Sequence, residues 1–248
     1  MDYKKMWKRL QKWAHQYSSP KGFDRLVGFF LPWLTVLGWL MLSIGVIWGL
    51  AFAPLDYQMG NSFRIIYLHV PSAALSLSIY VMMAIASFVF FVWRIRLAAY
   101  FARAAANYGA LLTALALITG AIWGKPTWGT YWAWDARLTS ELILLFLYLA
   151  YILLHESLEE HDQADRLAAI LAIIGLINIP IIHYSVVWWN SLHQGATLFK
   201  FDTPSITSDM LYPLLLILGA FYALFFAHTL KQMQILILKQ RITRVLQS

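Results

Sequence analysis

Between two long apolar runs the chain reads Trp123-Gly-Lys-Pro-Thr-Trp-Gly-Thr-Tyr-Trp-Ala-Trp-Asp-Ala-Arg-Leu-Thr139. Four Trp, one Tyr, one Asp and one Arg are concentrated in this short connection. Trp and Tyr combine an apolar ring with one polar atom, so they collect where membrane meets water, and such a belt accounts for two or three of them. The spacing of Trp128, Trp132 and Asp135 predicts one helix face, with Gly129 leaving room beside Trp128.

The apolar runs predict an all-α membrane protein. Of the 248 residues, 60% are hydrophobic and 12% charged, which indicates one compact membrane domain. A helix crosses a bilayer in about 17–25 residues, whereas a signal peptide has an apolar core of only about 7–15, so we expect the first run to be retained as a span. The six predicted spans lie near residues 26–53, 70–93, 104–123, 138–154, 167–189 and 210–230.

The basic residues orient these spans. Fifteen of the 19 Lys and Arg residues fall in the terminal segments and the second and fourth connections, and four in the other three connections. The positive-inside rule therefore predicts six transmembrane helices with cytoplasmic N- and C-termini and an external Trp-rich stretch. The net charge of +7 is interpreted as a cytoplasmic fringe, so no nucleic-acid partner is expected.

Three regions are predicted along the chain. Residues 1–26 are basic and carry aromatic residues at helical spacing, typical of an amphipathic segment on the lipid bilayer. Residues 27–230 form the membrane domain, and residues 231–248 a basic cytoplasmic tail. The acidic connection between residues 155 and 166 is expected to be a solvated hairpin. The outer loops are expected at about 54–69, 124–139 and 190–209.

Two histidines are predicted at the depth of the Trp-rich stretch. The chain has no cysteine, so iron would be bound by His, Met, Tyr or a carboxylate. His69 is expected at the outer mouth of the second span, with Pro71 in its first helical turn, and His193 just beyond the outer end of the fifth. A lone interfacial histidine is usually an anchor. Two beside an aromatic wall indicate a flat amphipathic ligand such as a porphyrin.

The other histidines are weaker candidates. His183 lies within the fifth span, shortly after Pro180, where ionisable groups are rare and often functional. No other histidine lies in mid-span to pair with it, so we expect a polar contact at the floor of a pocket. The remaining histidines fall on or near the cytoplasmic side.

The motif Trp128-Gly-x-x-Trp132-x-Trp134-Asp135-x-Arg137-Leu-Thr resembles the WWD motif of membrane heme-handling proteins. Its Asp-x-Arg-Leu-Thr ending resembles the cytochrome c maturation protein C family in particular, because related families usually have Pro where Ala136 stands. The segments around His69 and His193 resemble the two histidine segments of that family. The similarity covers most of residues 60–200, and a Lys is common in the family where His183 stands.

The resemblance implies that His69 and His193 are axial ligands of heme b on the periplasmic face of the bacterial inner membrane. The ring would lie against Trp residues, and cations would bind its propionates, with Lys125 near the same depth. Asp135 would orient a donor or cap the fourth span. The other residues predicted to bind heme are Arg64, Trp123, Trp128, Trp132, Trp134 and Arg137.

The resemblance also implies partners. A periplasmic heme chaperone of the cytochrome c maturation protein E type would receive the heme. An ABC-type ATP-binding subunit and membrane subunits, including a small single-span subunit, would form a complex with this chain. Since the sequence has no P-loop, the chain is not expected to be an enzyme by itself.

Three alternatives remain open at this point. A b-type electron-transfer membrane subunit would need a pair of histidines in mid-membrane. A transporter or scaffold without heme would use its aromatic residues only as a belt. A complete cytochrome c synthetase would need a soluble domain for which this chain is too short.

Overall fold

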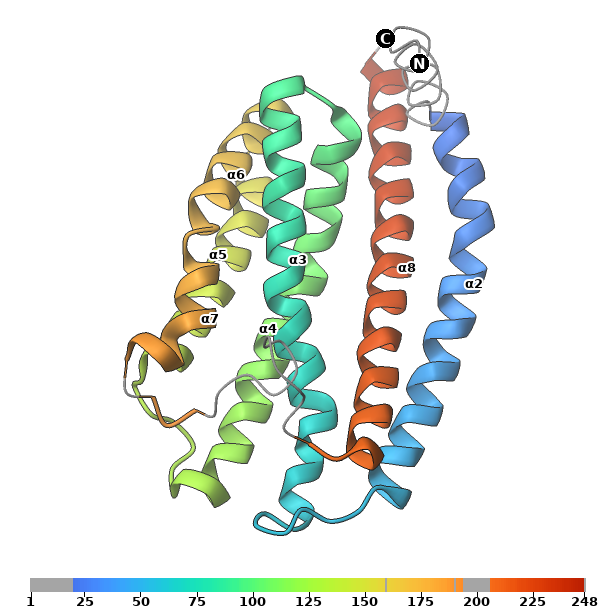
Figure 1. The fold of residues 1–248 in the computed structure, drawn as a ribbon. Coiled ribbons are helices and arrows are strands. Elements are labelled where there is room, and N and C mark those ends of the chain that lie inside the picture. The colour runs from blue at the N-terminus through green and yellow to red at the C-terminus, as the bar shows by residue number, and fades with distance from the viewer. Residues whose placement is uncertain (1–19, 159, 190, 194–205, 248) are drawn as a thin grey trace, which may run out of the picture.

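The computed structural model describes residues 20–158, 160–189, 191–193 and 206–247, and these residues are helical with no β-strand. Figure 1 shows the helices as a bundle of roughly parallel rods. The elements are α2 (Pro20–Ile47), a π-helical turn (Trp48–Phe52), a 3-10 helix (Asn61–Ile65), α3 (Ile66–Trp93), α4 (Arg96–Trp128), α5 (Ala136–Ser157), α6 (His161–Gly175), α7 (Asn178–Trp188) and α8 (Ser208–Gln247).

Six helical stretches of the described chain are long and apolar enough to cross a membrane, which confirms the predicted all-α class and six spans. The fifth stretch consists of two helices, α6 and α7. The backbone turns at residues 176–177 between them. Most of the predicted segment 1–26 lies outside the described residues. The last helix does not end with the apolar run but continues through residues 231–247.

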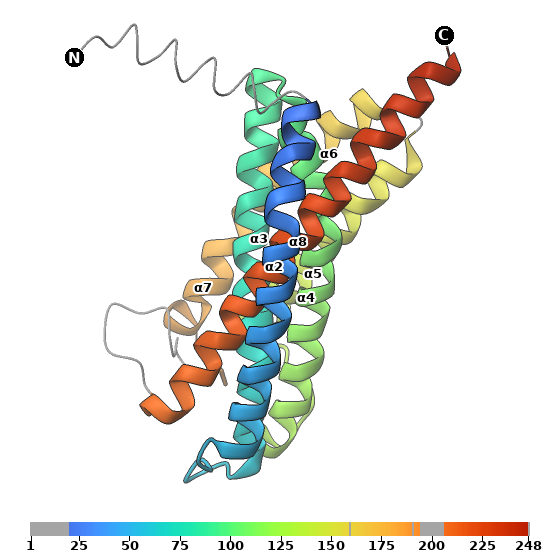
Figure 2. The ribbon, with the colours of Figure 1, turned by 90° about the vertical axis from the view of Figure 1, so that its right-hand side faces the viewer.

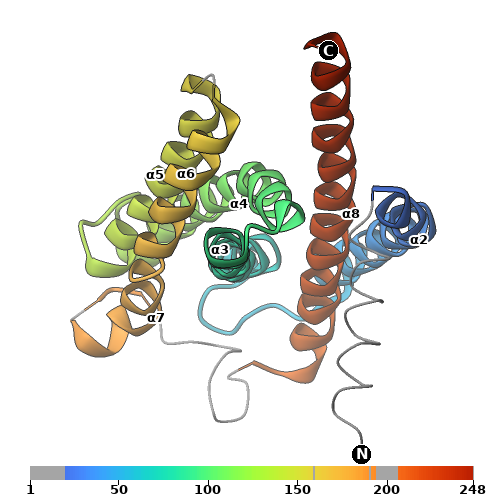
Figure 3. The same cartoon turned by 90° about the horizontal axis from the view of Figure 1, so that it is seen from above.

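The helices form two groups around a central pair. α3 and α4 pack against each other in the middle, α2 and α8 pair along one side, and α5, α6 and α7 cover the other (Figures 1 and 3). Figure 2 shows α8 crossing α2 at a tilt. Gly45 and Gly219 let this pair approach closely, because a Cβ at either position would meet Ile217 or Met41 of the facing helix.

The connections gather at two ends of the bundle. The start of α2, the α3–α4 and α5–α6 connections and the end of α8 lie at one end (Figure 1). The connections from α2 to α3 and from α4 to α5, and the end of α7, lie at the other. The Trp-rich stretch and both predicted histidine segments therefore share the second end, hereafter the Trp end.

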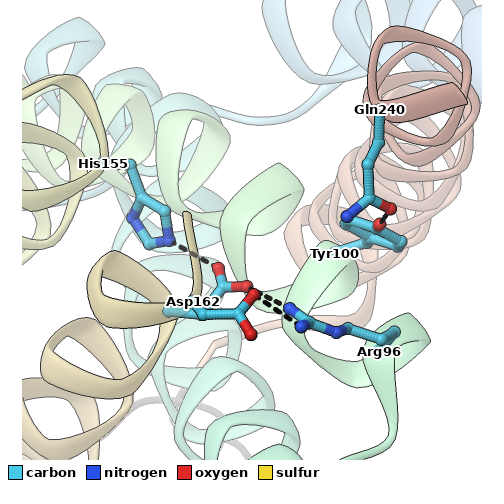
Figure 4. A network of polar contacts seen from close by, with 6 residues as sticks. Arg96, Tyr100, His155, Asp162 and Gln240 are labelled. Atoms are coloured by element: carbon cyan, nitrogen blue, oxygen red, sulfur yellow. Dashed lines mark hydrogen bonds and ion pairs between the residues drawn. The ribbon is translucent and has the colours of Figure 1, made fainter. Parts of the chain in front are cut away.

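A polar network ties the helices together at the opposite end (Figure 4). Arg96 lies 2.5 Å from Asp162 and 3.2 Å from Asp165, and His155 Nε2 lies 3.1 Å from the second carboxylate oxygen of Asp165. Beside it, Tyr100 donates a hydrogen bond to Gln240. The side chains of His155 and Asp165 are only 3% and 9% exposed. The expected solvated hairpin holds for Glu156 and Glu160, which are exposed, but not for His155 and Asp165. The charge of Arg96 and the imidazole compensate the buried carboxylate of Asp165.

Candidate functional site

The Trp-rich stretch is helical in its first part and irregular in its second. α4 continues through Trp123 and ends at Trp128, where the next residue, Gly129, has a left-handed φ of 78° and donates to the Lys125 carbonyl at 3.1 Å. Residues with a side chain adopt this conformation at an energetic cost. Because Gly129 ends the helix, the prediction that Trp128, Trp132 and Asp135 share one helix face was wrong.

Asp135 connects the start of α5 to the segment that carries His193. One carboxylate oxygen accepts from the backbone N–H of Leu138 at 2.8 Å and so caps the helix, as one of the two predicted roles required. The other accepts from the Ser191 hydroxyl at 2.6 Å. The Ser191 oxygen in turn accepts from the backbone N–H of His193 at 3.1 Å. The position of His193 thus depends on an aspartate in another connection.

His69 is oriented by α4. Its Nδ1 lies 3.1 Å from the Ala116 carbonyl and 3.1 Å from the Thr119 hydroxyl. A carbonyl can only accept, so Nδ1 carries the proton and Nε2 of the neutral ring is an acceptor. α3 already begins at Ile66, which places Pro71 beyond the first helical turn, contrary to the prediction.

The rings of the two predicted histidines lie close together. The ring centroids of His69 and His193 are 6.2 Å apart, and their planes differ by 33°. Each also lies beside one indole: Trp123 is 5.7 Å from His69, and Trp128 is 6.1 Å from His193. Residues separated by more than a hundred positions therefore form one aromatic cluster.

This cluster borders a cavity between α3, α4, α5 and α7. The cavity has a volume of about 170 Å³ and is partly open to the surroundings. Its wall is mostly apolar and includes small residues of α3 and α4, while Arg137, Glu141 and the exposed His183 add polar groups. The predicted site residues that line it are His69, Trp123, Trp128, Arg137 and His193.

Four other predicted residues do not line this cavity: Asp135, described above, Arg64, Trp132 and Trp134. Arg64 lies in the 3-10 helix and donates to the Ala53 carbonyl at 3.1 Å, which ties the end of the first span to the start of the second. Trp132 and Trp134 pack edge to face at 5.4 Å, and Trp134 is 78% exposed. Trp134 therefore lies on the outer surface of the Trp end, whereas Trp132 is half-buried and its indole nitrogen is covered. Lys125, predicted at the depth of the propionates, donates a hydrogen bond to the Gly129 carbonyl at 3.0 Å.

Sequence reasoning missed some of the wall. Met59 and Thr127 line the cavity, and nothing in their local sequence indicates this. Glu141 does carry a signal, since it is a carboxylic acid one turn after Arg137 within a predicted span, and such residues are usually functional.

Comparison with known proteins supplies the family. The chain matches the family model described as heme exporter protein C over residues 13–247. It is 48% identical to heme exporter protein C of Haemophilus influenzae over 229 residues, 92% of this chain and 93% of that one. Identity to the Escherichia coli protein is 49% over 233 residues, 94% and 92% of the two chains. The chain is 44% identical to heme exporter protein C of Bradyrhizobium diazoefficiens over 225 residues, which are 91% of this chain and 85% of that one. The chain therefore belongs to the heme exporter protein C family.

Proposed function

We propose that this protein binds heme b between His69 and His193 at the Trp end and delivers it for the maturation of c-type cytochromes. Membership of the heme exporter protein C family supports a role in heme handling. The observation that carries the proposal is the separation of the two imidazoles, whose ring centroids lie 6.2 Å apart.

This spacing suits two ligands of one iron. An imidazole nitrogen bonds a transition metal at about 2 Å and lies roughly 1 Å from its ring centroid, so two rings across one metal have centroids about 6 Å apart. The tautomer of His69 supports the same assignment. Metal-bound imidazoles usually donate their other N–H to a carbonyl or carboxylate, and Nδ1 of His69 has the Ala116 carbonyl at 3.1 Å.

The cavity wall also suits a porphyrin. Its apolar residues can contact the ring, and Arg137 supplies a guanidinium for a propionate. The Trp123 indole nitrogen is buried and has no acceptor among the described residues, so it is a donor for a bound carboxylate. His69 and His193 would together hold the iron, and two protein ligands would suppress its reaction with oxygen. The chain would hold the heme between two protein-supplied ligands until transfer.

The Trp end is assigned to the periplasm, because four of 19 basic residues belong to the connections at this end. Tyr131, 58% exposed, and Trp134 form an aromatic surface there. We propose that a heme chaperone of the cytochrome c maturation protein E type docks on this surface. An ABC-type ATP-binding subunit and membrane subunits, one of them small and single-span, would complete the assembly in the bacterial inner membrane.

The test is the absorption spectrum of the full-length protein purified in mild detergent. We expect a six-coordinate heme spectrum in the wild type and its loss in His69→Ala and in His193→Ala, while His183→Ala keeps it. Loss of heme only in His183→Ala would favour a b-type electron-transfer subunit. No Soret absorbance in the wild type, even after heme addition, would favour a transporter or scaffold.

Sidedness is tested separately. Since the chain has no cysteine, single cysteines can be placed at Tyr131 and, as the matched position at the other end, at Glu156. A membrane-impermeant thiol reagent added to spheroplasts should label only the first. Labelling of the second alone would overturn the assigned orientation.

A further inference from the structure

Glu141 is a buried carboxylic acid in the cavity wall for which the proposed function has no role. The residue is 9% exposed and lies within the fourth span. Its Oε1 accepts a 2.8 Å hydrogen bond from the Ser76 hydroxyl on α3. The Ser76 carbonyl accepts from the Tyr148 hydroxyl at 2.7 Å. The carboxyl group is therefore held in a defined position on the cavity wall.

Few charged groups face Glu141. Arg137, one turn earlier on α5, interacts with it electrostatically and lines the same cavity, but no cation lies within 4 Å of its carboxylate among the described residues. α3 contributes the Ser76 hydroxyl, and Tyr148 on α5 itself interacts electrostatically with Glu141. His183 of α7 lines the same cavity. The part of α4 that borders the cavity, residues 116–128, has one ionisable side chain, Lys125. Its amine donates a hydrogen bond to the Gly129 carbonyl.

The carboxylate lies too deep to bind the same iron as His69. Ser76 follows His69 by seven residues on α3, which corresponds to about 10 Å along the helix axis. Across that distance Glu141 acts through its charge alone. In a cavity with apolar walls such a charge is screened much less than in water.

If an iron porphyrin is bound in the cavity, the charge of Glu141 affects the reduction potential of the iron. Ferric iron between two neutral imidazoles leaves one positive charge on the porphyrin core, and ferrous iron leaves none. A nearby buried carboxylate stabilises the ferric form, because the environment of a heme tunes its reduction potential. Once the iron is reduced, the same carboxylate has lost its compensating charge and binds a proton more readily.

On the basis of the proposed heme site, we propose that Glu141 compensates the positive charge of the ferric iron bound there. Ionised Glu141 stabilises ferric iron and takes up one proton when the iron is reduced. One electron passes from an external one-electron donor to the iron, and one proton passes from a hydronium ion of the solvent to the carboxylate. One O–H bond breaks in hydronium and one forms on Glu141, and no other bond changes. Glu141 acts on the iron electrostatically from a distance and does not bind it.

The experiment is a redox titration of the heme-loaded full-length protein with dye mediators, followed by absorption at several pH values between 6 and 8. In the wild type the midpoint potential should fall as pH rises. The slope can reach about 59 mV per pH unit, the one-electron equivalent of a tenfold change in proton concentration. In Glu141→Gln the potential should be more positive and independent of pH, while Glu141→Asp should keep the slope. The exposed Glu156, at the other end of α5, gives the matched control Glu156→Gln, expected to behave as wild type.

Two outcomes would overturn the assignment. One is a Glu141→Gln protein with the wild-type spectrum, potential and slope. The other applies if that variant does not fold: Ser76→Ala removes the hydroxyl that stabilises the carboxylate, and an unchanged potential at pH 7 would count equally against Glu141. A wild-type protein that lacks the bis-histidine spectrum would overturn the proposed heme site instead, so the two failures are distinguishable.

Discussion

Ser191 donates a 2.6 Å hydrogen bond to Asp135, and through it the segment after α7 is fixed to the N-cap of α5. The same hydroxyl oxygen accepts from the His193 backbone at 3.1 Å. The acidic residue of the Trp-rich motif is thus connected to a proposed heme ligand through a single side chain. The relationship separates two roles of Asp135, helix capping and ligand placement, which substitutions can test independently.

Ser191→Ala should lower heme affinity about tenfold, the lower range for the loss of a group that orients a metal ligand. The cap of α5 is untouched, so the free energy of unfolding should fall by only about 1 kcal/mol. Heme titration and chemical denaturation of the same preparation measure the two effects. Asp135→Ala should add the loss of the cap, about 1 kcal/mol more, whereas Asp135→Asn keeps a capping side chain. Wild-type heme affinity in Ser191→Ala would refute the connection.

Gly120→Ala should weaken heme binding without loss of stability. A Cβ at this position would lie 3.0 Å from Cε1 of His69, so the imidazole must move. Alanine is favoured over glycine in a helix by about 1 kcal/mol, which opposes any cost of that movement to folding. The matched control is Gly28→Ala in α2, where a Cβ meets no atom within 4 Å. Heme titration should distinguish the two variants; equal affinities would show that the His69 ring tolerates displacement.

Trp128→Ala and Trp134→Ala should separate binding from transfer. Trp128 lines the cavity beside His193, so its removal should reduce the heme content of the purified protein severalfold. Trp134 is 78% exposed and lies outside the cavity wall, so its variant should retain heme but lose affinity for the chaperone. Absorption spectra and a pull-down with the purified chaperone measure these effects. Reversal of the two phenotypes would contradict the division of the Trp end into wall and outer surface.

The network at the opposite end gives a stability prediction. Asp165, 9% exposed, contacts both Arg96 and His155, whereas Asp162 is 50% exposed and also contacts Arg96 (Figure 4). Asp165→Ala should lower the free energy of unfolding by about 2 kcal/mol, because it leaves the buried Nε2 of His155 without its hydrogen-bond partner, while the partly exposed Arg96 keeps Asp162. Asp162→Ala should lower it by less than about 1 kcal/mol. Chemical denaturation in detergent checks the difference, and similar losses would mean that burial does not distinguish the two ion pairs.

The spans were predictable because bilayer thickness fixes the length of an apolar helix, and this held for all six. Their ends were not predictable from apolarity. α4 begins at Arg96, well before its apolar run, because a helix satisfies its own backbone hydrogen bonds whether its side chains are polar or not. For the same reason α8 extends through its basic C-terminal region.

The end of the bundle at which the site residues lie was predictable, because it follows from the number and order of the spans. Counting spans places His69, His193 and the Trp-rich stretch at one end, and the structure brings them together. Which indole faces inward depends on a single backbone conformation, that of Gly129, whose left-handed φ breaks the helical spacing between Trp128 and Trp132. Sequence periodicity cannot supply such information, because it presumes the helix continues.

The α2–α8 pair lies beside the cavity rather than around it, although α8 also packs against α3 and α4 in the shared core. Among the described residues, neither helix contributes to the cavity wall, which comes from the 2–3 connection, α3, α4, α5, α7 and His193. The outward surface of the α2–α8 pair can therefore vary between relatives that contact different membrane proteins, while the cavity wall is unchanged. Chimeras that exchange the α2–α8 pair between family members should retain their spectra and alter only which assemblies they join.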